Sequence, residues 1–166
     1  GKLILMALVD YAGDAEAGER ALAPFRALAE PLADMVQPMP YAGLFEPAEE
    51  MEVTEESARS LFMDTVDAAA AATIVERLQA STAPMAVAQL RALGGAMARV
   101  PADATAFAHR HSRIMANVAA FYEGPADRDR RQAWVDGAAA ALQQGDEGAY
   151  VNFLGDERPE RVRQAY

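Results

Sequence analysis

Four segments with two different hydrophobic periodicities constrain the fold of this chain most. Residues 85–93 and 113–122 are typical of strands, whereas residues 65–80 and 126–144 carry apolar side chains at helical spacing. The order of these segments lacks the regular strand–helix–strand rhythm of a parallel sheet. We therefore predict an α+β fold in which an antiparallel sheet is covered by helices on one face.

The predicted strand at residues 85–93 has two unlike faces. Gln89 and Arg91 lie on the bulkier face, and alternation places smaller side chains on the other, namely Ala86, Ala88, Leu90 and Ala92. Gly94-Gly95 interrupts this strand. The pair predicts a bulge, or a close approach by another backbone or a ligand.

Weaker signals predict the remaining elements. The apolar run at residues 3–9 is bounded by turn residues and predicts a buried strand, and Asp14 is placed to cap a helix over residues 15–29. The remaining expectations are an extended segment at residues 32–39, a loop at 46–56, strands at 59–63 and 148–153, and the beginning of a helix at 158–166. Trp134 is expected to face inward from the helix at residues 126–144.

Composition limits the class of protein. The 166 residues suit one domain, and we expect residues 1–166 to form one. The absence of cysteine excludes disulfides and thiolate metal sites in this chain. A net charge of −10, from 25 acidic and 15 basic residues without a basic cluster, argues against a nucleic-acid partner. No apolar run approaches the roughly 18 residues of a membrane span, so no membrane partner is expected.

Common cofactor and catalytic motifs are absent from the sequence. It contains neither a Gly-x-Gly-x-x-Gly nor a Gly-x-x-x-x-Gly-Lys-Ser/Thr loop, and no Gly-x-Ser-x-Gly turn. The only two histidines, His109 and His111, would point the same way on a strand and could meet one metal ion. Because no carboxylate adjoins them, we favour one packed and one surface histidine and predict no metal site.

Polar residues in the predicted strands at residues 85–93, 113–122 and 148–153 are candidate site residues. In the last of these strands, alternation places Tyr150 and Asn152 on one face, and a phenol beside an amide can take a proton from a substrate hydroxyl. Asn117, between apolar neighbours, needs a partner, either another strand's backbone or a bound ligand. Arg91, on the same face as Gln89, would clamp an anionic substrate or pair with one of the many acidic residues. A structural role is the simpler interpretation of each residue alone.

A series of short motifs runs along nearly the whole chain: Tyr11-Ala12-Gly13-Asp14, Gly18-Glu19, Pro24-Phe25-Arg26, Pro31-Leu32-Ala33-Asp34, Met39-Pro40-Tyr41, Leu93-Gly94-Gly95-Ala96, Thr105-Ala106-Phe107-Ala108-His109-Arg110, Trp134 and Tyr150-Val151-Asn152-Phe153. Each motif alone has little specificity. In this order they resemble the substrate-binding domain of bacterial oxidases of the berberine bridge enzyme type, within the vanillyl-alcohol-oxidase superfamily of flavoproteins.

This resemblance implies FAD as cofactor and a small-molecule substrate. Enzymes of this type have an N-terminal FAD-binding domain, and their substrate domain lays an antiparallel sheet over the flavin ring. An alcohol or amine carbon passes a hydride to the flavin, which molecular oxygen usually reoxidises. The family's Tyr-x-Asn tyrosine is a base or substrate anchor that faces the flavin, a role that falls on Tyr150, with Asn152 a second flavin-facing candidate.

The resemblance also implies a polar pocket residue, Gln or Glu in the family, on the preceding long strand. Asn117 is the best match, although its shorter side chain departs from the pattern and puts an acid–base role in doubt. Gln89, Arg91 and Asn152 are the further substrate-binding candidates.

The family's FAD-binding domain and C-terminal return segment have no counterpart in these residues. We therefore expect an excised or truncated substrate domain, inactive alone, whose partner is the FAD-binding domain of its parent, with the cytoplasm as default location. The alternative is a non-catalytic α+β ligand-binding or dimerisation module, whose apolar sheet face would form a homodimer. An apolar face without Tyr150 and Asn152 favours the module, and converging polar groups favour the oxidase.

Overall fold

The computed structural model describes residues 2–45, 55–145 and 148–153. The chain divides into two compact units, a smaller one of Lys2–Met51 and a larger one of Glu52–Tyr166. All of the described strands belong to the larger unit.

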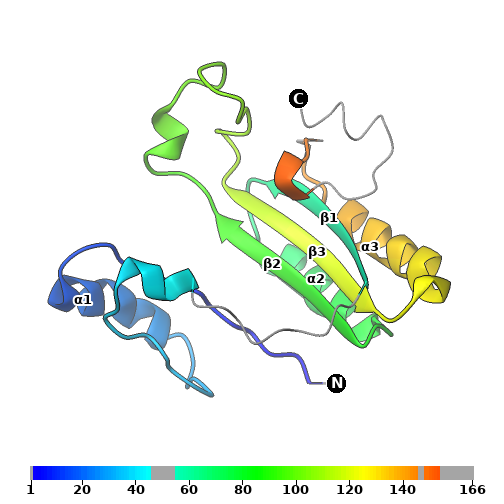
Figure 1. Cartoon of the computed structure of the whole chain (residues 1–166), viewed down its shortest axis with the longest axis horizontal. Coiled ribbons are helices and arrows are strands. Elements are labelled where there is room, and N and C mark those ends of the chain that lie inside the picture. The colour runs from blue at the N-terminus through cyan, green and yellow to red at the C-terminus, as the bar shows by residue number, and fades with distance from the viewer. Residues whose placement is uncertain (1, 46–54, 146–147, 154–166) are drawn as a thin grey trace. The chain divides into compact units, whose positions relative to one another are not determined.

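The larger unit is built on a three-stranded antiparallel sheet (Figure 1). Its strands lie in the order β1 (Glu55–Met63), β3 (Ile114–Tyr122) and β2 (Met85–Ala92), so β3 is central. Two helices, α2 (Ala68–Ala80) and α3 (Arg128–Leu142), pack against one face of the sheet (Figure 1). The predicted α+β fold with an antiparallel sheet and helices on one face is confirmed.

The hydrophobic core lies between the sheet and the helices. Its buried members are Leu61, Met63, Ala116, Val118, Ala138, Ala139 and Leu142. The smaller face of β2 is on the side of the sheet that faces the helices, because Ala88 pairs with the core residue Val118. Trp134 packs at the edge of this core as predicted, and its indole N–H donates to the carbonyl of Arg77 at 3.2 Å.

The two helices begin later than their periodicity predicts. The carboxylate of Asp67 accepts a hydrogen bond from the Ala70 backbone N–H at 2.8 Å, which caps α2 and fixes its start at Ala68. A short 3₁₀ turn, η3 (Pro125–Asp127), precedes α3, with proline in the first turn, where its missing N–H costs no hydrogen bond.

Two predicted strands are wrong. Residues 3–9 form no strand, and Leu5 and Leu8 in this run are 97% and 91% exposed. A strand needs a neighbour for its backbone hydrogen bonds, and the described residues of the smaller unit contain no other strand. Residues 148–153 contain instead a 3₁₀ turn, η4 (Val151–Phe153).

Other predicted boundaries are partly corrected. Glu55 and Glu56 belong to β1 and not to a loop, whereas residues 46–54 and the expected helix at 158–166 lie outside the described residues. Gly94 and Gly95 have φ angles of 131° and 57° and follow the end of β2, and a Cβ added at either would meet no atom within 4 Å. Within the described part of the chain, they therefore end the strand and no other backbone approaches them closely, while the approach of a ligand stays a prediction.

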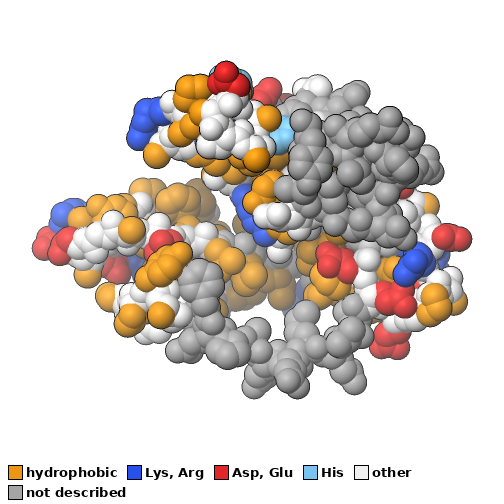
Figure 2. All heavy atoms as spheres, turned by 45° about the horizontal axis from the view of Figure 1, so that its top comes forward, with side chains coloured by type: hydrophobic (Ala, Val, Ile, Leu, Met, Phe, Trp, Pro, Cys, Tyr) orange, Lys and Arg blue, Asp and Glu red, His pale blue; other side chains and the backbone are white. Residues whose placement is uncertain are grey.

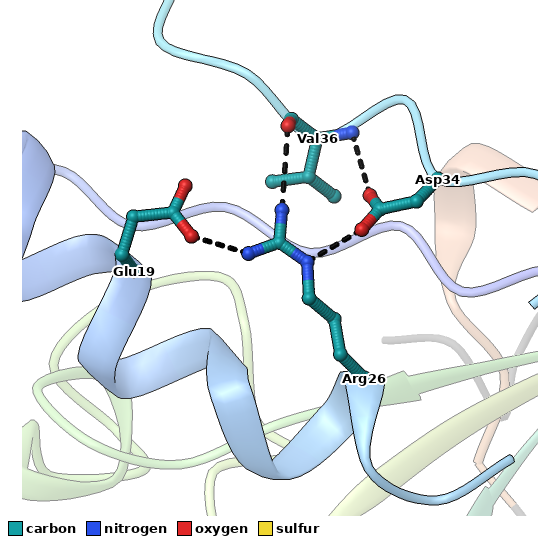
Figure 3. A network of polar contacts seen from close by, with 4 residues as sticks. All are labelled: Glu19, Arg26, Asp34 and Val36. Atoms are coloured by element: carbon teal, nitrogen blue, oxygen red, sulfur yellow. Dashed lines mark hydrogen bonds and ion pairs between the residues drawn. The ribbon is translucent and has the colours of Figure 1, made fainter. Parts of the chain in front are cut away.

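The smaller unit contains α1 (Ala15–Arg26) and a 3₁₀ turn, η1 (Tyr41–Phe45). Asp14 caps α1 as predicted, accepting from the Ala17 N–H at 2.9 Å. The end of α1 is tied to the following segment by Arg26, which donates to Asp34 at 2.5 Å and also to Glu19 and the Val36 carbonyl (Figure 3). This guanidinium lowers the pKa of the Asp34 carboxyl below its ordinary value, and the N–H of Val36 adds to the effect.

Candidate functional site

The sheet face turned away from α2 and α3, which we call the distal face, carries the candidate residues. Alternation and antiparallel register arrange its side chains in rows that cross all three strands, because paired residues point to the same side. The four rows are Glu56–Phe121–Met85, Ala58–Ala119–Val87, Ser60–Asn117–Gln89 and Phe62–Met115–Arg91. Of these rows, only Ser60–Asn117–Gln89 is polar across all three strands.

The centre of the polar row contains an unsatisfied amide. Asn117 is only 5% exposed, and its Oδ1 atom is buried without a hydrogen-bond partner among the residues that the structure describes. A buried polar atom that lacks a partner costs about 1–3 kcal/mol, so such atoms are few in folded proteins. The amide oxygen of Asn117 is therefore an unused acceptor, and a bound group would have to displace the side chains that cover it to donate a hydrogen bond.

The turn at residues 148–153 brings Tyr150 and Asn152 to the same face. The backbone N–H of Tyr150 donates to the hydroxyl of Ser60 at 3.3 Å, which attaches the turn to the polar row. The amide of Asn152 donates to the Tyr150 hydroxyl oxygen at 2.9 Å. The strand alternation used to pair these two side chains is wrong, but the side chains are in direct contact.

Arg91 lies at one end of the distal face. Its guanidinium donates to the Gln89 amide oxygen at 3.0 Å and lies 4.8 Å from the centre of the Phe153 ring. Among the described residues, no carboxylate forms an ion pair with Arg91. Gln89, Arg91, Asn117, Tyr150 and Asn152 are thus connected, through Ser60 and Phe153, into one cluster.

Aromatic side chains surround this cluster. The rings of Phe62 and His109 stack with their centres 3.9 Å apart, and Phe107 meets both His109 and Tyr150 edge-on, at 5.8 Å and 6.0 Å. The ring of Phe153 lies 5.5 Å from that of Tyr150. The cluster is therefore built from polar groups with aromatic neighbours, a composition common in small-molecule sites.

Sequence reasoning missed Ser60, Phe62 and Phe107 as parts of the site. The first two have a usable signal, because alternation within the predicted strand at residues 59–63 places them on one face. Phe107 lies in an irregular segment, where periodicity carries no information.

The two histidines are placed as the sequence suggests, with His109 packed on Phe62 and His111 exposed. Neither lies in a strand. In the described residues, no three His, Cys, Asp or Glu side chains are grouped so that they could hold a metal ion.

Charges are dispersed on the face of the molecule drawn in Figure 2. Among the coloured residues there, basic side chains lie singly or in small groups between acidic and hydrophobic ones. The described helices also include none with the length and apolar character needed to cross a membrane.

Comparison with protein-family models and with curated proteins finds no match. Among solved structures, the chain is similar to BBE-like #28 from Arabidopsis thaliana, with a TM-score of 0.56 and 23% sequence identity. The match covers 66% of this chain and 26% of that one, so this chain spans about a quarter of the length of its structural neighbour. At this identity the similarity shows the fold, which is BBE-like, in agreement with the motif series.

Proposed function

We propose that this chain supplies the substrate side of the active site in an FAD-dependent oxidoreductase that oxidises a small organic alcohol or amine, with oxygen as acceptor. The observation that carries the proposal is the convergence of Tyr150, Asn152 and the unsatisfied Asn117 oxygen on the distal face. The BBE-like fold supports the same assignment, because it is the fold that the motif series implies.

The residues present are compatible with a flavin held by another domain. The buried Asn117 oxygen lacks a donor within the described part of the chain, and Tyr150 and Asn152 offer further polar atoms on the same face. When bound, the flavin would supply the hydride acceptor. Tyr150 and Asn152 are the residues of this chain that we assign to the flavin-facing side.

The chain's own residues would orient the substrate and move its proton. The Asn152 amide donates to the Tyr150 oxygen, so the phenolic proton is left to bind a substrate atom. A second O–H or N–H group of the substrate would donate to Asn117 Oδ1, which relieves the unsatisfied acceptor. Tyr150 is then the group that relays the substrate proton: its oxygen takes that proton while its own phenolic proton passes to solvent.

This arrangement favours the oxidase over the alternative of a non-catalytic binding or dimerisation module. A surface designed to pair with a second copy would be apolar in its buried centre. The centre of the distal face is instead the polar pair of Ser60 and Asn117, both buried.

The test is the visible absorption spectrum of the protein encoded by the complete reading frame, before and after acid precipitation. A flavin spectrum supports the proposal, and its retention in the precipitate would show covalent attachment. A colourless protein that also fails to bind added FAD would refute it and leave the binding module as the explanation.

A further inference from the structure

We propose that Arg91 binds the carboxylate of an aromatic acid, which makes aryl carboxylates the substrate class of the oxidoreductase proposed above. That the ligand is a substrate rests on the proposed function. That the ligand is an aromatic carboxylate rests on Arg91 and its neighbours. Sequence reasoning leaves Arg91 with two alternatives, an anionic ligand or an acidic side chain.

The structure bears on that choice. The chain has 25 acidic residues and a net charge of −10, so acidic partners are abundant. Within the described ranges none of them forms an ion pair with Arg91, which shares this feature with Arg77, Arg99, Arg110 and Arg113. A guanidinium without an acidic partner there is a suitable binding group for a carboxylate, which it can hold with two parallel N–H donors.

Two contacts hold the Arg91 guanidinium in place without neutralising it. One N–H group of Arg91 donates a hydrogen bond to the Gln89 amide oxygen at 3.0 Å. The Cζ atom of Arg91 lies 4.8 Å from the centre of the Phe153 ring. Both contacts are favourable to a cation and leave its charge uncompensated. The guanidinium is therefore oriented on the distal face before any ligand binds.

The spacing of the rows indicates the size of the ligand. Neighbouring rows on one face of a sheet are two residues apart, or roughly 7 Å. A carboxylate at Arg91 would thus place an attached aromatic ring over Gln89, the exposed end of the Ser60–Asn117–Gln89 row, beside Phe153. A hydroxyl or amine substituent on the far side of that ring would then lie within reach of the Tyr150 hydroxyl.

The experiment is calorimetric titration of the complete protein with benzoate and with benzamide, its neutral analogue of the same shape. We expect benzoate to bind more tightly than benzamide. Arg91→Gln should weaken benzoate binding roughly 10- to 100-fold, the range for hydrogen bonds to a charged group, and leave benzamide binding unchanged. Arg91→Lys should restore part of the affinity, because it keeps the charge without the two-pronged geometry.

The matched control is Arg99→Gln, which removes an exposed arginine of η2 (Met97–Arg99) that belongs to none of the distal-face rows. It should leave both affinities at the wild-type value. Equal losses in the Arg91 and Arg99 variants would overturn the inference. So would a wild-type protein that does not bind benzoate, the outcome expected if an acidic residue of another domain occupies Arg91.

Calorimetry measures benzoate binding and does not depend on the flavin. The carboxylate site and the oxidoreductase can therefore be refuted independently of each other. A colourless protein that fails to bind added FAD, and whose benzoate affinity depends on Arg91, would refute the oxidoreductase and retain the carboxylate site. A flavoprotein whose benzoate affinity ignores Arg91 would retain the oxidoreductase and refute the aryl carboxylate.

Discussion

The amide nitrogen of Asn152 lies 2.9 Å from the hydroxyl oxygen of Tyr150 and donates a hydrogen bond to it. The backbone of Tyr150 is held in turn by Ser60 of β1. The phenol is thus fixed at both its backbone and its oxygen, while its own proton can still be donated.

This arrangement predicts that Tyr150→Phe lowers kcat in the complete, flavin-containing protein by about 10²–10⁴-fold, the usual effect of losing a general acid or base. The fold should persist, because phenylalanine keeps the ring contacts with Phe107 and Phe153. Steady-state kinetics with the identified substrate provides the measurement.

The matched control is Tyr122→Phe, since Tyr122 lies on the opposite face of the sheet, where its hydroxyl is 3.5 Å from that of Ser57. Loss of that hydroxyl should leave kcat unchanged. If Tyr150→Phe also turned over at the wild-type rate, Tyr150 would have only a packing role.

Asn117→Leu should separate stability from function. The substitution keeps a similar shape and removes a buried oxygen without a partner in the described part of the chain, so we expect the free energy of unfolding to stay within about 1 kcal/mol of wild type or to rise. Substrate affinity should fall, because the acceptor for the substrate is lost. Thermal denaturation and KM are the two measurements.

The comparison for this variant is Ser60→Ala, which removes the acceptor of the Tyr150 N–H. Because that change leaves a donor without its partner, it should lower the free energy of unfolding by about 1–3 kcal/mol. A destabilised Asn117→Leu would mean that the Asn117 side chain contributes to folding and is not kept for a ligand.

The sheet and its helices were predictable because their periodicity is long enough to identify them. β2 and β3 match the predicted strands to within one residue at each end, and α2 and α3 fall inside the predicted helices. A buried polar group in the middle of this sheet could be predicted from Asn117 alone, because its neighbours in the sequence are apolar. Its pairing with Ser60 and Gln89 depends on strand register, which hydrophobic periodicity does not specify.

The two strands that were predicted wrongly, at residues 3–9 and 148–153, have a different physical explanation. Residues 3–9 and 148–153 are short runs in which hydrophobicity indicates burial or exposure poorly, because a strand forms only where another strand offers hydrogen bonds. In the second case the Tyr150 N–H bonds to a serine side chain, and the Phe153 N–H donates to the Tyr150 carbonyl at 2.9 Å. Such local turn contacts leave no periodic trace in a sequence.

Arg131 should be the arginine on which the stability of the larger unit depends most. It is 4% exposed, and it donates to the Thr82 hydroxyl at 2.9 Å and to Asp127 at 3.0 Å, joining α3 to the segment after α2. We expect Arg131→Gln to lower the free energy of unfolding by about 1.5–3 kcal/mol, as for other hydrogen bonds to a charged group. Thermal denaturation tests this.

Arg130→Gln is the control, because Arg130 binds the same carboxylate, at 2.6 Å, but is largely exposed. Its loss should change stability little, as for most surface ion pairs. Equal effects of the two variants would show that burial of Arg131 does not strengthen its contacts.

The ion pair in the smaller unit predicts a pH dependence. The hydrogen bond from Arg26 is the main cause of the lowered pKa of Asp34 in the folded chain (Figure 3). A carboxylate with a lowered folded pKa contributes stability above its unfolded pKa of about 3.9, and loses it as pH falls through the folded value. NMR titration of the Asp34 carboxyl should therefore give a midpoint below that of an unfolded aspartate.

Arg26→Gln should move this midpoint back towards the ordinary value, because the charged donor is removed. Arg20→Gln is the matched control, since Arg20 pairs with Glu16 in the same helix and is not in contact with Asp34. An ordinary midpoint for Asp34 in the wild-type chain would show that the bond from Arg26 is not maintained in solution. In that case the segment after α1 would be held by other contacts.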